Sequence, residues 1–325
     1  MTGYLIRRLL YGFAVLLGVN LLTFVLFFAV NTPDDMARLN IGGKRVTAEA
    51  VEAWKVQRGY DKPLFWNEKA SGAGKVTDTI FWTQSVPLFT FDFGTSDAGR
   101  RIGAEIRTRM VPSLLLAVPT FILGVIVMVA WSLLVVMYRR TKLEMAAVGL
   151  SVFLMSVSGL FYIIAGQWLF GKVMQLVPVS GWQEGPGLAA FLALPVAIGV
   201  FSRLGGDTLL YRAMFLEEMN KDYVRCARAK GLTEGRIMSR HVLRNASLPI
   251  ITSTVAVLPM LFMGSLIMES FFGIPGLGSY TIDAVNAQDF SIVRAMVFLG
   301  TVAYIAGLIL TDVVYTWADP RIRLS

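Results

Sequence analysis

Residues 112–137, PSLLLAVPTFILGVIVMVAWSLLVVM, contain no ionisable side chain over 26 positions. A transmembrane helix needs about 20 predominantly apolar residues to cross the hydrocarbon core of a bilayer, so this stretch is long enough to span a membrane. Five further stretches have a similar character, although the fourth of the six is short and contains Pro195. They comprise residues 9–30, 146–170, 188–204, 248–268 and 292–315. The sequence therefore predicts an all-α integral membrane protein with six transmembrane helices.

The composition agrees with this class and argues against others. Of the 325 residues, 55% are hydrophobic and 16% are charged, and the mean hydropathy is +0.61. Soluble proteins have about 25% charged residues. Cys226 is the only cysteine and His241 the only histidine, which excludes a disulfide scaffold and leaves too few ligands for a zinc or iron–sulfur site.

The distribution of positive charge predicts the orientation. With the N-terminus inside, the short connections and ends on the cytoplasmic side hold sixteen lysines and arginines, whereas the two short outside loops hold only Lys172. Short cytoplasmic loops are rich in these residues, so we expect both termini in the cytoplasm. The net charge of +8 then reflects topology and not a nucleic-acid site. The basic start at Arg7 and Arg8 resembles a signal peptide, but its apolar core is too long and no small-residue cleavage site follows, so we expect an uncleaved anchor.

Three regions follow from this topology: residues 1–30 with the first helix, an extracytoplasmic region at 31–111, and a core at 112–325 with a cytoplasmic loop at 203–247. In the outer region, we expect a helix near 47–60 and a flexible turn at 71–75. Residues 80–93 are rich in aromatic side chains, which form either a small core, a membrane-interface layer or a stacking surface for a ligand. These are Phe81, Trp82, Phe89, Phe91 and Phe93.

Residues with catalytic or ion-coupling chemistry are scarce. His241 lies among cytoplasmic arginines, and no spacing of Ser, His and Asp suggests a catalytic triad. The GAGK of residues 72–75 lacks the first glycine and the Ser or Thr of a phosphate-binding loop. Asp312, near the inner end of the last span, is the one candidate for a coupling charge, although a boundary role explains it as well. Prolines 119, 195 and 259 and methionines 155, 260, 263 and 268 suit either a flexible pathway or ordinary packing.

The cytoplasmic loop has a pattern of its own. Phe215, Met219, Tyr223 and Ala227 recur every four residues, which predicts a helix with one apolar face. Gly231 then suits the left-handed residue that ends such a helix.

A second helix is predicted after this turn. Thr233 is placed to cap it, and Ile237, Met238 and Val242 would form its apolar face. The resulting elbow either rests on the inner leaflet as an amphipathic hairpin or docks on a partner protein. The pattern alone leaves both alternatives open.

Residues 222–252, DYVRCARAKGLTEGRIMSRHVLRNASLPIIT, resemble the signature loop of binding-protein-dependent ABC importer permeases. They are most similar to the first of the two permeases in the oligopeptide/dipeptide/nickel family. Ala227, Gly231 and His241 hold the expected positions, and Arg225 and Arg244 replace an acidic residue and a proline of the general motif as the first-type subunit does. Further resemblances cover YLIRRLL at 4–10, QRGYDKPL at 57–64, DFGTS at 92–96, IPGLG at 274–278 and DPRIRLS at 319–325. The segment between Leu64 and Asp92 is longer than the family pattern.

The resemblance implies the type I ABC importer permease fold and a place in a bacterial inner membrane. It implies three kinds of partner besides membrane lipid: a second homologous permease, two cytoplasmic ATPases and an extracytoplasmic substrate-binding protein. ATP and magnesium would bind to the ATPases, so this chain would hold no cofactor and catalyse no covalent step. The cargo would be peptides or similar small solutes, such as nickel chelates or antibiotic peptides. The residues implied in ATPase coupling are Arg225, Ala227, Arg228, Lys230, Gly231, Leu232, Thr233 and His241.

Two other classes compete with this hypothesis. A self-sufficient secondary transporter or channel would normally show costly mid-membrane charges and an internal repeat, and neither is evident in the sequence. An integral membrane enzyme would need a catalytic constellation.

Overall fold

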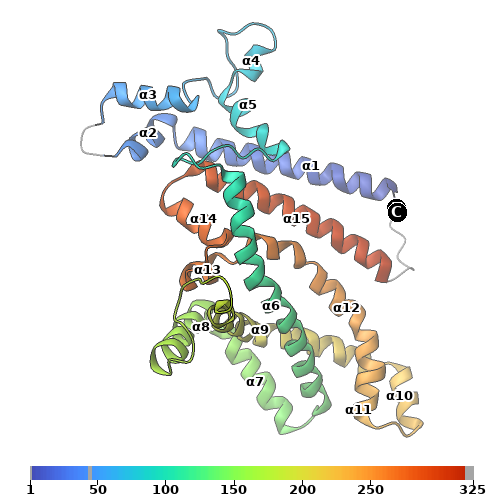
Figure 1. Cartoon of the computed structure of the whole chain (residues 1–325). Helices are drawn as coiled ribbons and strands as arrows, with labels where there is room; N and C mark the ends of the chain where they lie inside the picture. The colour runs from blue at the N-terminus through green and yellow to red at the C-terminus, as the bar shows by residue number, and fades with distance from the viewer. Residues whose placement is uncertain (1, 43–45, 319–325) are drawn as a thin grey trace. The chain divides into compact units, whose positions relative to one another are not determined.

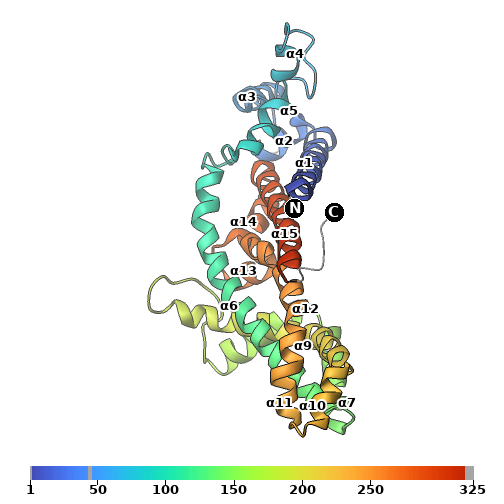
Figure 2. The same cartoon turned by 90° about the vertical axis from the view of Figure 1, so that its right-hand side faces the viewer.

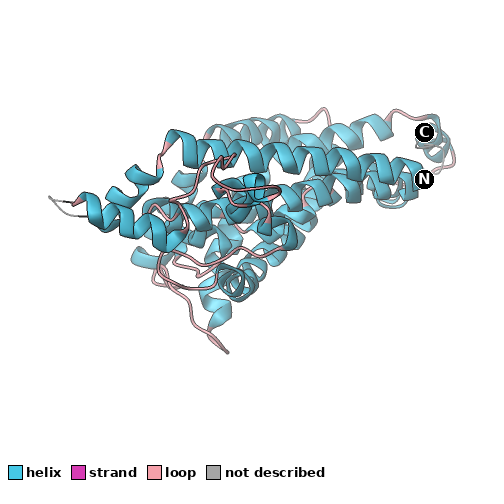
Figure 3. Ribbon diagram, turned by 90° about the horizontal axis from the view of Figure 1, so that it is seen from above, coloured by secondary structure: helices cyan, strands magenta, loops and turns pink. Residues whose placement is uncertain are grey.

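The computed structural model describes residues 2–42 and 46–318, and these residues are helical with no β-strand (Figure 3). The expected cytoplasmic arginines 321 and 323 lie outside the described residues. The chain forms two compact units. Unit 1 comprises Met1–Thr108 with Tyr280–Ile305, and unit 2 comprises Arg109–Ser279 with Ala306–Ser325.

Two long helices lie side by side in unit 1 (Figures 1 and 2). The helix α1 (Thr2–Val25) continues as the π-helical turn η1 (Leu26–Val30) and lies beside the first part of α15 (Phe290–Ala318). A Cβ added at Gly12 of α1 would lie 2.6 Å from the side chain of Ile305 on α15. The missing side chain of Gly12 therefore lets the two helices approach closely, and both predicted apolar spans are confirmed as helices.

The segment of unit 1 that is expected on the outer side of the membrane, here the outer segment, consists of short helices. They are α2 (Pro33–Ile41), α3 (Ala48–Arg58), α4 (Gly74–Thr77), α5 (Ile80–Ser85) and the 3-10 helix η2 (Pro87–Thr90). Thr47 accepts a capping hydrogen bond from the backbone N–H of Ala50 at 3.3 Å, and Gly59 ends α3 in the left-handed conformation. The helix predicted near residues 47–60 is confirmed.

Aromatic side chains form the core of unit 1. Phe24, Phe28, Met36, Tyr60 and Ile80 are buried there, and Phe81 packs against them. Phe89 contacts the rings of Phe13 and Phe298. The small-core interpretation is thus confirmed for Phe81 and Phe89, whereas Trp82 and Phe91 remain 41% and 56% exposed.

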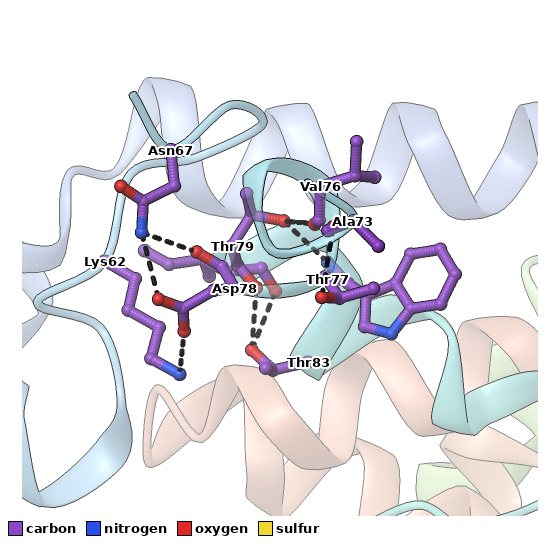
Figure 4. Close-up of polar contacts among 10 residues, drawn as sticks. Lys62, Asn67, Ala73, Val76, Thr77, Asp78, Thr79 and Thr83 are labelled. Carbon is purple, nitrogen blue, oxygen red and sulfur yellow. Dashed lines mark hydrogen bonds and ion pairs between the residues drawn. The ribbon is translucent and has the colours of Figure 1, made fainter. Parts of the chain in front are cut away.

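The segment between α3 and α5 is held by its own polar contacts (Figure 4). The carboxylate of Asp78 forms an ion pair with the ammonium group of Lys62 at 2.7 Å. It also accepts a hydrogen bond from the side-chain N–H of Asn67 at 2.9 Å. The hydroxyl of Thr79 donates to the carbonyl of Val76 at 2.7 Å. The flexible turn expected at residues 71–75 is therefore only partly correct, because α4 begins inside it at Gly74.

Unit 2 begins within α6 (Ile102–Met137), which confirms the span predicted at 112–137 and extends it towards the N-terminus. The span predicted at 146–170 is helical but is broken by a sharp bend. Here α7 (Lys142–Ser156) meets α8 (Gly159–Gly166), which continues as the π-helix η3 (Gln167–Val173), and the pair is bent by 92°. Val157 and Ser158 are extended, and the hydroxyl of Tyr162 donates to the carbonyl of Leu154 across the corner at 2.7 Å.

The helix α9 (Leu188–Met219) extends 15 residues beyond the span predicted at 188–204. The polar residues that suggested a loop are paired inside the helix or with α7: Arg203 pairs with Asp207 at 2.9 Å, and Arg212 pairs with Glu144. Because these charges are neutralised locally, the helix can continue.

The fifth predicted span, 248–268, is shifted towards the N-terminus. A continuous helical run covers Glu234–Met263 and includes α11 (Glu234–Ile237), the π-helix η4 (Met238–Val242), α12 (Leu243–Val255) and the 3-10 helix η5 (Leu258–Met263). After Gly264 the chain forms α13 (Leu266–Phe272) and α14 (Leu277–Asn286). Among the described residues, five helices are long and apolar enough to cross a membrane, or six if the bent α7–α8 pair is one span.

Candidate functional site

The elbow, here residues 222–242 and expected on the cytoplasmic side, starts at a break that the sequence pattern did not reveal. The single helix predicted through Phe215 and Ala227 is wrong, because α9 ends at Met219 and α10 (Asp222–Ala229) begins two residues after Asn220. The predicted apolar face is nevertheless confirmed. Phe215, Met219 and Ala227 are at most 5% exposed, and the hydroxyl of the half-buried Tyr223 donates to Glu218 at 2.6 Å.

The turn of the elbow is a Schellman motif centred on Gly231. This residue has φ +74°, in the left-handed region. Its N–H donates to the carbonyl of Arg228 at 2.9 Å, and the N–H of Leu232 donates to that of Ala227 at 3.3 Å. These are the two hydrogen bonds that define the motif. Leu232 packs against the same buried cluster as Ala227, so the predicted role of Gly231 as helix terminator is confirmed.

The second arm of the elbow is α11 followed by η4. Thr233 occupies the N-cap position, but within the described residues its hydroxyl accepts no capping bond. Its carbonyl accepts from the N–H groups of Arg236 and Ile237, both at 3.0 Å. The apolar face predicted for this arm is confirmed, since Ile237, Met238 and Val242 are at most 1% exposed.

The residues expected to couple to an ATPase divide into three groups. Arg225, Lys230, Gly231 and Thr233 are exposed, while Arg228, Leu232 and His241 are half-buried. Ala227 is 5% exposed and lies in the core of the elbow. Its small side chain therefore lets α10 pack closely against the rest of its own chain.

An ion pair fixes the two arms relative to each other. The guanidinium of Arg228 on α10 donates to both carboxylate oxygens of Glu234 on α11, at 2.6 and 3.2 Å. This hydrogen bonding raises the pKa of Arg228, so the positive charge is retained. Backbone hydrogen bonds and this side-chain ion pair thus both stabilise the turn of the elbow.

Further exposed cations lie on the second arm of the elbow and at its end. Arg236, Arg240 and Arg244 are all exposed on the second arm or just beyond it. The sequence predictions did not group these three arginines, although their spacing of four residues indicates one helical face. Basic side chains therefore outnumber the exposed carboxylates of Asp222 and Glu234 on the surface of the elbow, while its larger apolar side chains are buried or half-buried.

A second feature, which the sequence did not predict, is the buried carboxylate of Glu269 on α13. Glu269 is fully buried and accepts hydrogen bonds from the hydroxyl of Ser113 at 2.8 Å and from three backbone N–H groups. The three backbone donors are Ser265, Gly278 and Ser279, at 3.0, 2.7 and 3.1 Å. A side chain at Gly264 or Gly276 would clash with this carboxylate. Glu269 therefore ties α13, α14 and α6 together.

A cavity of about 260 Å³ lies between α6, α9 and the η5–α13 segment of unit 2. Pro195, Met260 and Met268 line it, together with the polar side chains of Thr120 and Ser202. Two of the four methionines singled out in the sequence, Met260 and Met268, therefore line a cavity. Met155 and Met263 do not line this cavity. Among the described residues, no three His, Cys, Asp or Glu side chains are placed to hold a metal ion.

Comparison with known families accounts for nearly all of the chain. The family described as the binding-protein-dependent transport system inner membrane component matches residues 106–324. The chain belongs to this family. A second family, the N-terminal region of such membrane components, matches residues 1–81. The permease is thus a transport subunit of a binding-protein-dependent ABC importer and a multi-pass membrane protein, with the all-helical type I fold.

Relatives extend over the whole permease. It is 30% identical over 329 residues to a protein of Brucella suis biovar 1 named a peptide transport system permease protein, covering 99% of each chain. It is also 30% identical over 334 residues to the glutathione transport system permease protein GsiC of Escherichia coli (strain K12), again covering 99% of each chain. These relationships place the permease among the importers of the peptide family.

Proposed function

We propose that the permease, as the first-type subunit, forms half of a translocation pathway for peptides or similar small solutes and pairs with a second homologous permease. The names of its relatives support this cargo class. The cavity lined by Pro195, Met260 and Met268 supports a pathway in unit 2, because thioether side chains adapt to varied solutes.

The elbow transmits force from a cytoplasmic ATPase pair in this proposal. The observation that carries it is the burial of its apolar face: Ile237, Met238 and Val242 lie in the core of the permease itself. A hairpin resting on the inner leaflet would instead turn an apolar face to the lipid. The exposed surface carries more cations than carboxylates around a rigid glycine turn, which suits an acidic groove on a partner protein.

The remaining parts of the importer follow from the same proposal. Both termini are cytoplasmic, the membrane is a bacterial inner membrane, and a soluble binding protein delivers the solute to the outer face. ATP and magnesium bind to two ATPase subunits, so the permease holds no cofactor of its own. Closure of the ATPases moves the elbow and rocks the helices between inward-open and outward-open states.

Affinity purification from mild detergent, with identification of the co-purifying proteins, tests the assembly. We expect a second permease and one or two ATPases. If the permease purifies alone and transports solute into liposomes without ATP, it is a secondary carrier and the proposal is wrong.

A further inference from the structure

Unit 1 contains a second cavity, of about 420 Å³, on the side assigned to the outer face. Its lining comes from the end of α3, from α5 and η2, from residues 92–99 and from the start of α15. This volume lies in the range of small-molecule sites, about 300–1,000 Å³, and is far larger than a single side chain needs. The cavity therefore has room for a solute of peptide size.

Arg294 on α15 supplies an uncompensated charge to this cavity. It is 4% exposed, and its guanidinium donates to the backbone carbonyl of Gln84 at 2.5 Å and lies 5.2 Å from the ring centre of Phe28. Within the described residues, its Nε has no hydrogen-bond partner and no carboxylate forms an ion pair with it. Buried charges in proteins are normally paired, because a charge taken out of water is costly.

The other cation of the lining, the half-buried Arg58, is neutralised. Arg58 forms an ion pair with Asp97 and lies 4.5 Å from the ring centre of Trp54. Asp97 also accepts a hydrogen bond from Asn40 at 2.7 Å. Of the two arginines that line the cavity, Arg294 thus has no ion-pair partner among the described residues, whereas the charge of Arg58 is paired.

We propose that this cavity binds the carboxylate of a peptide-sized solute at Arg294. A guanidinium presents donors in a planar fork that matches the two oxygens of a carboxylate. The lining also includes Asp92, an exposed carboxylate suited to an ammonium group, so both charged ends of a short peptide find a counterpart. The identity of the solute class rests on the proposed function, whereas the anion site rests on Arg294 itself.

Competition between two matched tripeptides tests the site. The permease, purified with its co-purifying subunits and without the soluble binding protein, is placed in nanodiscs and equilibrated with radiolabelled triglycine. Unlabelled triglycine and triglycinamide, which lacks the carboxylate, then compete for binding. We expect triglycine to compete at least tenfold better, since a hydrogen bond to a charged group is worth more than one between neutral groups. Equal competition, or no binding of triglycine, would overturn the proposal.

Three variants test whether Arg294 causes the preference for triglycine over triglycinamide. Arg294→Gln should abolish the preference for triglycine, and Arg294→Lys should retain part of it. Arg38→Gln, which removes one exposed charge from the same outer segment, should leave the preference unchanged. If Arg294→Gln does not fold, the wild-type competition and the lysine variant still decide the question. A wild-type permease that co-purifies with ATPases but does not discriminate would contradict this site and leave the proposed function intact, whereas a permease that purifies alone would contradict the function.

Discussion

Replacement of Gly231 by valine should uncouple the permease without preventing its insertion. Gly231 has φ +74°, and a Cβ built at this position meets no atom within 4 Å. The penalty is therefore conformational and not a clash. A left-handed conformation costs an L-residue about 1–2 kcal/mol, and more for a β-branched one. Since about 1.4 kcal/mol corresponds to a factor of ten, the native elbow of Gly231→Val should be at least tenfold less populated relative to alternative turns.

ATP-driven uptake into proteoliposomes containing the assembled importer measures this effect. We expect at least a tenfold loss for Gly231→Val at wild-type abundance in the membrane. Gly231→Asn is the matched control, because asparagine tolerates the left-handed region, and it should retain most of the uptake. Normal uptake by the valine variant would refute the reasoning that the Schellman turn transmits the conformational change.

Three further substitutions test the packing described above, each by the thermal midpoint of the purified permease. Glu269→Ala leaves four donors without their acceptor, each at a cost of about 1–3 kcal/mol when buried, so the midpoint should fall by several degrees; an unchanged midpoint would contradict the structural role. Ala227→Leu should overpack the elbow core by about 1–3 kcal/mol, whereas Cys226→Leu, at the exposed neighbouring position, should be tolerated; equal effects would show that Ala227 is not buried. Gly205→Val places a Cβ 2.5 Å from a backbone oxygen of α7, whereas at Gly206 the nearest atom is 3.9 Å away, so only the former should be destabilising.

The apolar runs and the charge distribution predicted most of the helices, because membrane insertion depends on local hydrophobicity. The spans at 9–30, 112–137 and 292–315 required no information beyond their own residues. The same holds for the elbow, where Gly231 and the apolar face of Ile237, Met238 and Val242 follow from spacing along a short segment.

The errors arise where partners distant in sequence decide the structure. The sequence predicted an end of α9 near Arg203, but the helix continues because Arg212 pairs with Glu144, 68 residues earlier. The enclosure of Glu269 depends on Ser113, 156 residues away. Likewise, the isolation of Arg294 becomes visible only when the lining of its cavity is known. None of these pairings has a signature within a local window.

The single cysteine provides the most direct test of the central claim, that the elbow docks on an ATPase. Cys226 is exposed on α10, so a maleimide carrying a photoreactive benzophenone can be attached there without engineering the chain. Illumination of the importer in native membranes should cross-link the permease to an ATPase subunit, and Cys226→Ser should abolish the product. Cross-linking only to lipid would show that the elbow rests on the inner leaflet and would contradict the account.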